Sequence, residues 1–277
     1  MRYFDLKKKI QKLFEEKGID ELSDIDWIAV EVLKVKRSFL PFVTDISASQ
    51  EQEIMQAVSK RLEHIPIAYI FGKTEFFGRE FQVDSNVLIP RMDTEVLVER
   101  LIHDIKKSQK ELSVLDIGTG SGAIAITIKK ETNAKVFAVD VSEKALEVAK
   151  QNAKNLEADV WFDLSDLFES VSDLKVDIVV SNPPYIETDV VQTLDKEVVN
   201  NEPILALDGG TDGLDFYRSI IQDAKQHLNA GGKVYFEIGY NQAESVSKLP
   251  EKDYEDIEVI KDYEGNDRVV IAKLRYL

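Results

Sequence analysis

The sequence predicts an α/β protein, in which a small N-terminal helical bundle and a β-hairpin linker precede a mainly parallel, seven-stranded sheet covered by helices. Two observations predict this fold. In roughly the first 65 residues, apolar side chains recur every three or four positions, which is the spacing of one helix face. Beyond residue 93, short apolar runs alternate with amphipathic segments, as in a doubly wound sheet. We therefore divide the chain into residues 1–71, 72–90 and 91–277.

The helical domain is expected to contain three helices. The first covers residues 6–14, where apolar side chains have helical spacing, and the second begins after Ser23. We expect the third to start at Ser49, because Gln52 follows three residues later and completes the pattern of a capping box. In the linker, strand-like aromatic residues lie on both sides of Gly78, which predicts a short β hairpin.

The α/β domain contains seven candidate strands, and helices are expected to open at Ser121, to follow Ser142 and to span 214–228. Ligands of such sheets bind beyond the carboxyl ends of the strands, so we expect the functional residues in the loops that follow the first four strands. The expected strands are 114–117, 136–139, 160–162, 178–181, 233–238, 257–260 and 269–272.

The composition excludes several classes of protein. Cysteine is absent and the three histidines, His64, His103 and His227, are isolated from one another, so we expect no disulfide, no thiol nucleophile and no metal site. No apolar stretch approaches the ~20 residues that span a bilayer, and the N-terminus lacks the pattern of a signal peptide. We therefore expect a soluble, cytoplasmic protein that does not contact a membrane.

The distribution of charge weighs against a nucleic-acid substrate. The chain has a net charge of -16, and residues 1–88 carry 13 Lys and Arg against 15 Asp and Glu. Nearly all of the excess negative charge therefore lies in the α/β domain. Enzymes that act on nucleic acid usually carry basic residues around the active site, because neutralising phosphates supplies much of their affinity.

The first strand of the α/β domain leads into a glycine-rich turn, Asp116-Ile117-Gly118-Thr119-Gly120-Ser121-Gly122. Alternating glycines let a ligand approach the main chain, and Asp140 follows at the ~20-residue interval expected for a carboxylate that binds ribose hydroxyls. The pattern also fits a dinucleotide site or a turn that only packs a strand on a helix. Asp116 favours a cationic ligand, because its carboxylate would repel a pyrophosphate and attract the amino group of a methionine moiety.

This turn, together with Asp140, is similar to the first two motifs of class I methyltransferases, which use S-adenosylmethionine. In that family an acidic residue near the adenine ends the third strand, and Asp166 and Leu167 occupy the corresponding position. An alternative role for Asp166 is to cap a helix, because it precedes an apolar pair.

The fourth strand runs directly into Asn182-Pro183-Pro184-Tyr185. A stiff turn would explain the prolines, but neither the polar residue before them nor the aromatic residue after them. An amide or amino nitrogen is a poor nucleophile because its lone pair is delocalised. The Asn182 side-chain oxygen and the Pro183 carbonyl could accept hydrogen bonds from its two N–H groups and direct the lone pair at a methyl donor. The Tyr185 ring could stack on the planar group. The same position makes Asn182 a candidate cofactor contact.

Segments outside these motifs carry a more specific resemblance. They are Pro66-Ile67-Ala68-Tyr69-Ile70-Phe71-Gly72, Glu75-Phe76-Phe77-Gly78, Val87-Leu88-Ile89-Pro90-Arg91-Met92-Asp93-Thr94-Glu95, Glu202-Pro203, Leu207-Asp208-Gly209-Gly210, Asp212-Gly213-Leu214 and Glu237-Ile238-Gly239.

With these segments the chain resembles the HemK/PrmC family of release factor glutamine methyltransferases over nearly its whole length. The resemblance implies a helical N-terminal domain that helps to dock the substrate, a β-hairpin linker and a Rossmann-like methyltransferase domain. It also implies that residues 182–185 hold the glutamine of a release factor's Gly-Gly-Gln motif, while residues 118–122 and Asp140 hold S-adenosylmethionine.

One segment departs from the family pattern. Where the family usually has Arg-Pro-Glu-Thr-Glu, this chain has Arg91-Met92-Asp93-Thr94-Glu95. Asp93 and Thr94 could still cap the following helix, so direct roles for Arg91, Glu95 and Glu202 stay open. The alternatives in substrate are a ribosomal-protein glutamine, which the Thr-Glu pair disfavours, and an adenine amino group of DNA or RNA. An NAD-dependent oxidoreductase is a further alternative.

Overall fold

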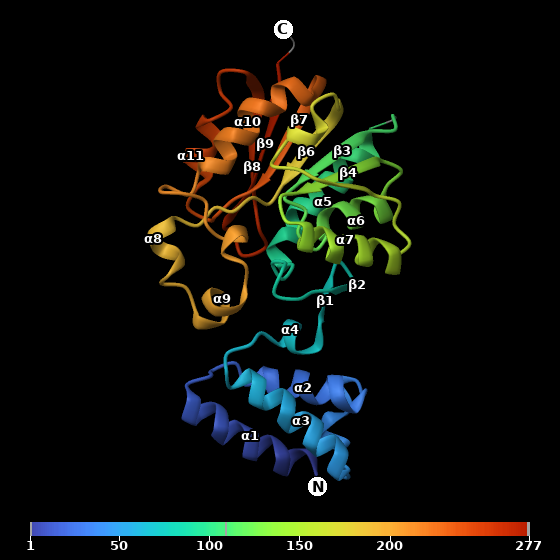
Figure 1. Cartoon of the computed structure of the whole chain (residues 1–277), viewed down its shortest axis with the longest axis vertical. Coiled ribbons are helices and arrows are strands. Elements are labelled where there is room, and N and C mark those ends of the chain that lie inside the picture. Colours follow the sequence, from blue (N-terminus) through green and yellow to red (C-terminus); the bar gives the residue numbers. More distant parts are fainter. Residues whose placement is uncertain (1, 109, 276–277) are drawn as a thin grey trace. The chain divides into compact units, whose positions relative to one another are not determined.

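The computed structural model describes residues 2–108 and 110–275, and the chain forms two compact units. One unit contains the chain up to Lys73 together with Asp195–Asn201. The other contains Thr74–Leu194 and the chain from Glu202 onward. The grouping of Asp195–Asn201 with the helical unit was not part of our expectation, because nothing in the local sequence pattern distinguishes it from the domain that surrounds it. The elements of both units are labelled in Figure 1.

The first unit is the expected helical bundle. Leu6, Ile10 and Phe14 of its first helix are at most 1% exposed and pack with apolar residues of the second and third helices. Its elements are α1 (Tyr3–Lys17), α2 (Ser23–Leu33), the 3-10 helix η1 (Arg37–Phe42), α3 (Ala48–Arg61), α4 (Ile67–Phe71) and α9 (Lys196–Asn201).

The predicted start of α3 at Ser49 is wrong. The capping box is formed by Ser47 and Gln50: the Gln50 N–H donates to Ser47 Oγ (3.2 Å), and the Ser47 N–H donates to Gln50 Oε1 (3.0 Å). Two Ser-x-x-Gln pairs overlap in this sequence, so the pattern alone could not choose between them. The chain enters from the buried Ile46 with Ser47 in the extended conformation that an N-cap requires, and this selects the earlier pair.

A buried arginine connects α9 to the rest of this unit. Arg61 is 2% exposed, and its guanidinium lies 2.7 Å from both Asp24 and Glu197. The Asn201 side chain also donates to the His64 carbonyl at 2.9 Å. A buried guanidinium is stable only when it is paired, so these carboxylates explain why residues 195–201 belong to the helical unit although they lie far along the chain.

The second unit contains the predicted seven-stranded sheet. Its strand order is β5-β4-β3-β6-β7-β9-β8, with every pair parallel except those made by β9. The mainly parallel fold is therefore confirmed. The strands are β3 (Ser113–Ile117), β4 (Lys135–Asp140), β5 (Trp161–Leu164), β6 (Val176–Ser181), β7 (Leu228–Glu237), β8 (Tyr254–Lys261) and β9 (Asp267–Leu274).

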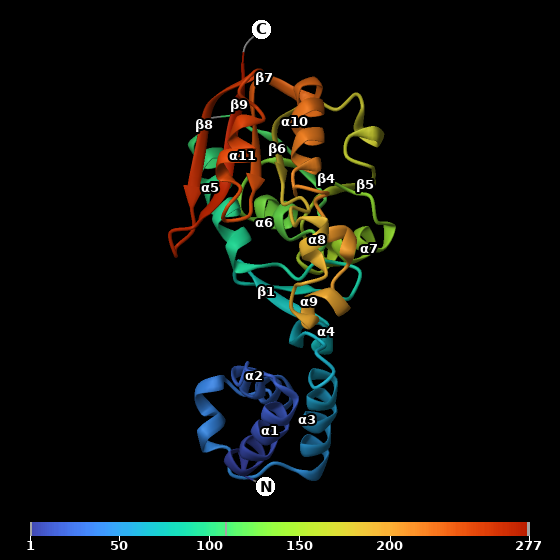
Figure 2. The same ribbon diagram turned by 90° about the vertical axis from the view of Figure 1, so that its left-hand side faces the viewer.

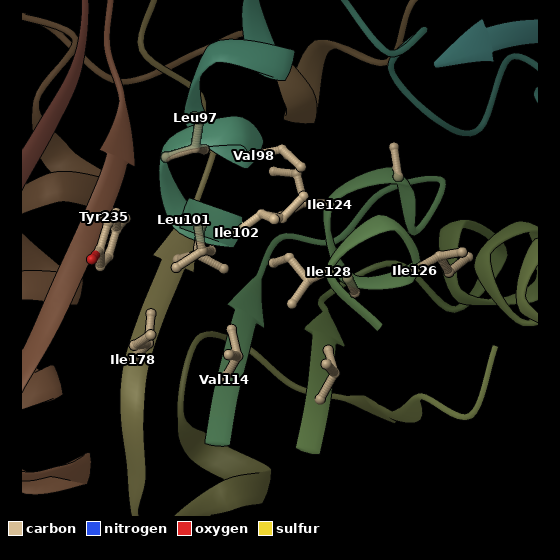
Figure 3. Packing of buried hydrophobic residues seen from close by; sticks show 14 of the residues in the cluster. Leu97, Val98, Leu101, Ile102, Val114, Ile124, Ile126, Ile128, Ile178 and Tyr235 are labelled. Carbon is tan, nitrogen blue, oxygen red and sulfur yellow. The ribbon is translucent and has the colours of Figure 1, made fainter. Parts of the chain in front are cut away.

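Helices cover both faces of this sheet, as Figures 1 and 2 show from two sides. On one face, α5 (Met92–Lys107), α6 (Ala123–Glu131) and α7 (Glu143–Asn155) share a core with the strands. Figure 3 shows part of this core, where Leu101 of α5 points toward Val114 of β3 and Ile178 of β6, and Leu97 lies further along the same helix. The opposite face packs against α10 (Asp215–His227) and α11 (Ala243–Lys248).

The linker contains the predicted hairpin, made of β1 (Lys73–Phe76) and β2 (Arg79–Gln82). Its turn residues, Phe77 and Gly78, both have positive φ angles, of 51° and 69°. Two positive φ values in a two-residue loop match the right-handed twist of the paired strands. Within residues 2–108 and 110–275, no helix combines the length and the apolar composition needed to cross a lipid bilayer.

Candidate active site

One cavity of the second unit lies at the carboxyl edge of the sheet, where β3, β4 and β6 end side by side. In the strand register, Ile117 pairs with Val139 on one side and with Ser181 on the other. The loops that follow these residues therefore emerge next to one another. The cavity is lined by these predicted site residues: Gly118, Thr119, Gly120, Ser121, Asp140, Asp166, Leu167, Asn182, Pro183 and Pro184.

The glycine-rich loop leaves its main chain open to the cavity. Gly118 and Gly120 have φ angles of 71° and 55°, and a Cβ on either would meet no atom within 4 Å. Gly122 differs, because a Cβ there would lie 2.8 Å from Ile126 and 3.2 Å from Ala149. The first two glycines thus leave space for a ligand, whereas the third permits close packing of α6 against α7.

Asp140 connects this loop to the end of β4. Its Oδ2 accepts a hydrogen bond from the Gly120 N–H at 2.8 Å, and its Oδ1 accepts one from the Ser142 N–H at 2.9 Å. Burial raises the pKa of Asp140, and these backbone hydrogen bonds act in the opposite direction. Each carboxylate oxygen can accept more than one hydrogen bond, so Asp140 retains the capacity to bind ligand hydroxyls in the cavity.

Asp116 lies beneath the glycine-rich loop, outside the cavity lining. It is fully buried and accepts a hydrogen bond from the Thr119 hydroxyl at 2.6 Å. Burial raises the pKa of Asp116 to about 7. This geometry lets Asp116 hold Thr119 in place. A contact of its carboxylate with a methionine amino group stays a prediction.

Asp166 and Leu167 line the cavity after β5, as predicted from their position. Asp166 is exposed, and Leu167 has a positive φ of 48°. The alternative role for Asp166 as a helix cap is not seen, because the Ser165 hydroxyl, and not Asp166, accepts the side-chain hydrogen bond from the N–H of Ser170. Asp166 is therefore free to face a ligand.

Asn182, Pro183 and Pro184 form a second wall of the cavity. Ser181, just before them, donates its hydroxyl to the Ile117 carbonyl at 2.7 Å and so ties β6 to β3 at this edge. The Asn182 Nδ2 donates to Thr94 Oγ1 at 3.3 Å. Thr94 comes from α5 and also lines the cavity, whereas the sequence pattern indicated only a helix cap at this position.

Tyr185 does not line this cavity, in contrast to the stacking role expected for it. Its ring packs against the core between the sheet and α10, and burial raises the pKa of its hydroxyl to about 12. The main chain at Tyr185 is closely covered: a Cβ on Gly209 would lie 2.7 Å from Tyr185 Cα, and one on Gly213 would lie 2.4 Å from the Tyr185 carbonyl oxygen. These two glycines are thus needed for the turn to pack.

The sequence left open whether Arg91, Glu95 and Glu202 act directly in the site, and the structure shows their contacts. Arg91 lines the cavity and forms an ion pair with the buried Glu202. Glu95 lies outside the lining, and its Oε1 accepts a hydrogen bond from the Phe77 N–H at 2.8 Å, which holds the hairpin turn. Asp93 pairs with Arg268 at 3.0 Å. The expectation that Asp93 and Thr94 cap α5 is wrong, since no side chain caps its N-terminus.

The cavity walls fit S-adenosylmethionine. Gly118 and Gly120 leave open main chain for the methionine portion, and Asp140 can accept hydrogen bonds from the ribose hydroxyls. Val141, an apolar residue outside the sequence motifs, lines the cavity and is 50% exposed, so it provides surface for a planar base. Local sequence gives no signal for this residue, because apolar residues next to strands usually belong to the core.

Two family models match the chain. The Methyltransferase small domain matches residues 91–201, and the PrmC N-terminal domain matches residues 5–72. These matches cover both the helical region and much of the α/β region, including the glycine-rich loop and Asn182–Tyr185.

Curated relatives match over nearly the full chain. A release factor glutamine methyltransferase from Fusobacterium nucleatum is 40% identical, over 97% of this chain and 78% of the relative. One from Bacillus cereus is 39% identical, over 99% of this chain and 100% of the relative. Among solved structures, a methyltransferase from Pyrococcus furiosus aligns with 79% of this chain and all of its own, with a TM-score of 0.57 and 22% identity. At this identity the structural likeness supports the fold alone.

Proposed function

We propose, because this chain belongs to the release factor glutamine methyltransferase family, that it methylates the side-chain amide nitrogen of a glutamine in peptide chain release factors. The methyl donor is S-adenosylmethionine. The observation that carries the proposal is that the glycine-rich loop and Asn182–Pro184 line the same cavity. The family resemblance points to the glutamine of a Gly-Gly-Gln motif as the acceptor.

We assign the two walls of the cavity different tasks. Gly118–Ser121 and Asp140 bind the cofactor, with Asp166 and Leu167 near its base, while Gly122 lets the following helix pack and Asp116 positions the loop through Thr119. When bound, S-adenosylmethionine supplies a methyl group on a positively charged sulfur. Asn182 Oδ1 and the Pro183 carbonyl accept hydrogen bonds from the acceptor's two N–H groups and so orient the nitrogen lone pair. The rings at 183 and 184 limit the conformations of that carbonyl.

No residue has to act as a general base before methyl transfer in this proposal. The amide nitrogen becomes strongly acidic only as its new bond to carbon forms, and it then loses one proton to solvent. The helical unit is proposed to help dock the release factor. We expect the reaction to occur in the cytoplasm, where the protein substrate is made.

A methyl-transfer assay with labelled S-adenosylmethionine tests this function. The enzyme is incubated separately with a release factor, with the same factor carrying Gln→Ala in its Gly-Gly-Gln motif, with ribosomal proteins and with adenine-containing DNA or RNA. We expect label only on the unmodified release factor. Label on nucleic acid or on ribosomal protein would replace the proposed substrate, and no label on any acceptor would overturn the function.

A further inference from the structure

A buried carboxylate lies behind the proposed acceptor site. Glu237 is the last residue of β7, and its side chain is 1% exposed. In the parallel pair of β6 and β7, Ser181 aligns with Phe236, so Asn182 and Glu237 follow at adjacent positions of the sheet edge. Glu237 does not line the cavity, whereas Asn182 does. The carboxylate can therefore contact the Asn182 side chain on the side that faces away from the cavity.

Glu237 interacts with both polar side chains of this wall. Burial raises its pKa to about 7, while hydrogen bonding to the side chains of Thr94 and Asn182 acts in the opposite direction. Thr94 is 4% exposed, and its Oγ1 accepts the hydrogen bond from Asn182 Nδ2. The Oε2 atom of Glu237 has no hydrogen-bond partner, so the carboxylate is not neutralised by a direct ion pair at that oxygen.

The chemistry of these groups determines which way the Asn182 amide faces. An asparagine side chain has one end that accepts and one that donates, and the two ends have nearly the same shape. The ionised form of Glu237, which predominates above its pKa of about 7, has only acceptors, so an amide oxygen turned toward it would lose a hydrogen bond and face negative charge. With Nδ2 toward Thr94 and Glu237, Oδ1 is left for the cavity.

We propose that Glu237, together with Thr94, is a positioning element that holds the Asn182 amide with its oxygen toward the methyl acceptor. Thr94 accepts from Asn182 through Oγ1, and its hydroxyl proton is available for the carboxylate. This inference rests on the proposed function, because it assumes that Asn182 Oδ1 accepts a hydrogen bond from the acceptor nitrogen. Neither Glu237 nor Thr94 has to touch the reacting atoms.

Steady-state kinetics on four variants test the proposal. Glu237→Gln and Thr94→Val should each lower kcat by roughly 10- to 100-fold, since small errors in orienting a reactant cost this much. The Kd for S-adenosylmethionine should change by less than about twofold, because the cofactor contacts lie in other loops. The KM for the release factor should also change by less than about twofold, because the variants alter the orientation of Asn182 and leave the docking of the protein substrate intact. Thr94→Ser keeps the hydroxyl and should restore kcat to within about threefold of the unmodified enzyme.

Thr127→Val is the matched control. Thr127 is fully buried in α6, its hydroxyl has no hydrogen-bond partner, and it lies outside the cavity lining. Its replacement should leave kcat unchanged. Unaltered kcat in Glu237→Gln, or a loss in Thr94→Ser as large as in Thr94→Val, would overturn the proposal. If Glu237→Gln does not fold, the comparison of kcat between Thr94→Val and Thr94→Ser tests the proposal.

Side-chain amide resonances of Asn182 give a test that does not need a substrate. In the unmodified protein these N–H protons should exchange slowly with water, because they point away from the cavity. Thr94→Val and Glu237→Gln should accelerate their exchange, whereas Thr127→Val should not. Equal exchange rates in all variants would refute the positioning role. Failure of the release factor assay would instead refute the proposed function and leave this result standing.

Discussion

The two loops that line the cavity follow neighbouring strands, β3 and β6, but they are built by opposite means. The glycine-rich loop presents main chain, with positive φ angles at Gly118 and Gly120 and open space where side chains would lie. The loop after Ser181 presents a side chain, Asn182, on a backbone that two prolines stiffen. The glycine-rich loop leaves space for a ligand beside its main chain, and the loop after Ser181 holds a single polar side chain in a defined direction.

The contacts that support the two loops also differ in sequence distance. The glycine-rich loop is held from nearby: Thr119 bonds to Asp116, and the Gly120 N–H bonds to Asp140 twenty residues away. Asn182 is held by Thr94, 88 residues before it, and the turn is covered by Gly209 and Gly213. Remote substitutions should therefore disturb acceptor orientation more readily than cofactor binding.

The largest effect is expected from Asn182→Ala. Loss of the amide oxygen should lower kcat by roughly 100- to 1,000-fold, as for removal of one orienting group from an oxyanion site. Affinity for S-adenosylmethionine, measured by calorimetry, should fall by less than about threefold, because a different loop holds it. Equal losses of turnover and cofactor affinity would remove the distinction between the two loops.

Asp140→Ala should weaken cofactor binding, which Asn182→Ala should leave nearly unchanged. Removing the carboxylate deletes the proposed ribose contacts and frees the Gly120 N–H, so the Kd for S-adenosylmethionine should rise by roughly 10- to 100-fold, as for lost hydrogen bonds to a charged group. Asp166→Ala, at an exposed position on the same cavity, is the comparison variant and should have a smaller effect. Unchanged affinity in Asp140→Ala would contradict the assignment.

Two glycine variants should separate binding from packing. Gly122→Ala places a methyl group 2.8 Å from Ile126 in a backbone with φ of 82°, so unfolding free energy should fall by about 2 kcal/mol. Gly120→Ala meets no neighbouring atom and should cost about 1 kcal/mol through its positive φ, while weakening cofactor binding. Denaturant titrations and calorimetry measure these effects. A larger loss of unfolding free energy in Gly120→Ala than in Gly122→Ala would contradict the assignment of Gly122 to packing and of Gly120 to cofactor binding.

The smallest effect is expected from Asp116→Asn. The raised pKa, about 7, means that the folded state keeps a proton that the unfolded state loses from about pH 4 upward. The protonated Asp116 therefore contributes to the free energy of unfolding fully below the unfolded pKa, and this contribution is lost as pH rises toward 7. The variant should therefore gain about 1 kcal/mol relative to the unmodified protein between pH 5 and pH 6.

Asp177→Asn is the control for this titration. The pKa of Asp177 is lowered in the folded protein, with burial opposed by hydrogen bonds from Ser113 and Asn229, so its titration lies below this pH interval. Its stability relative to the unmodified protein should stay constant from pH 5 to pH 6. A constant difference for Asp116→Asn as well would show that Asp116 is ionised throughout.

The sequence was sufficient for the features whose causes are local. Alternating strands and helices predicted the mainly parallel sheet, and the glycines of 118–122 predicted an open turn at its carboxyl edge. The loops after the four parallel strands were expected to share one edge for a topological reason, and the cavity is found there. Errors arose where two local patterns competed, as for the capping boxes at Ser47 and Ser49.

By itself the sequence determined the fold class, the family and the two loops, because these depend on periodicity, on backbone freedom and on motifs that are contiguous in the chain. Only the tertiary structure decided that Asp116 lies beneath the loop, that Tyr185 packs into the core and that Thr94 contacts Asn182. The orientation of a side chain and its burial depend on neighbours that folding brings from distant segments. No pattern of nearby residues contains that information.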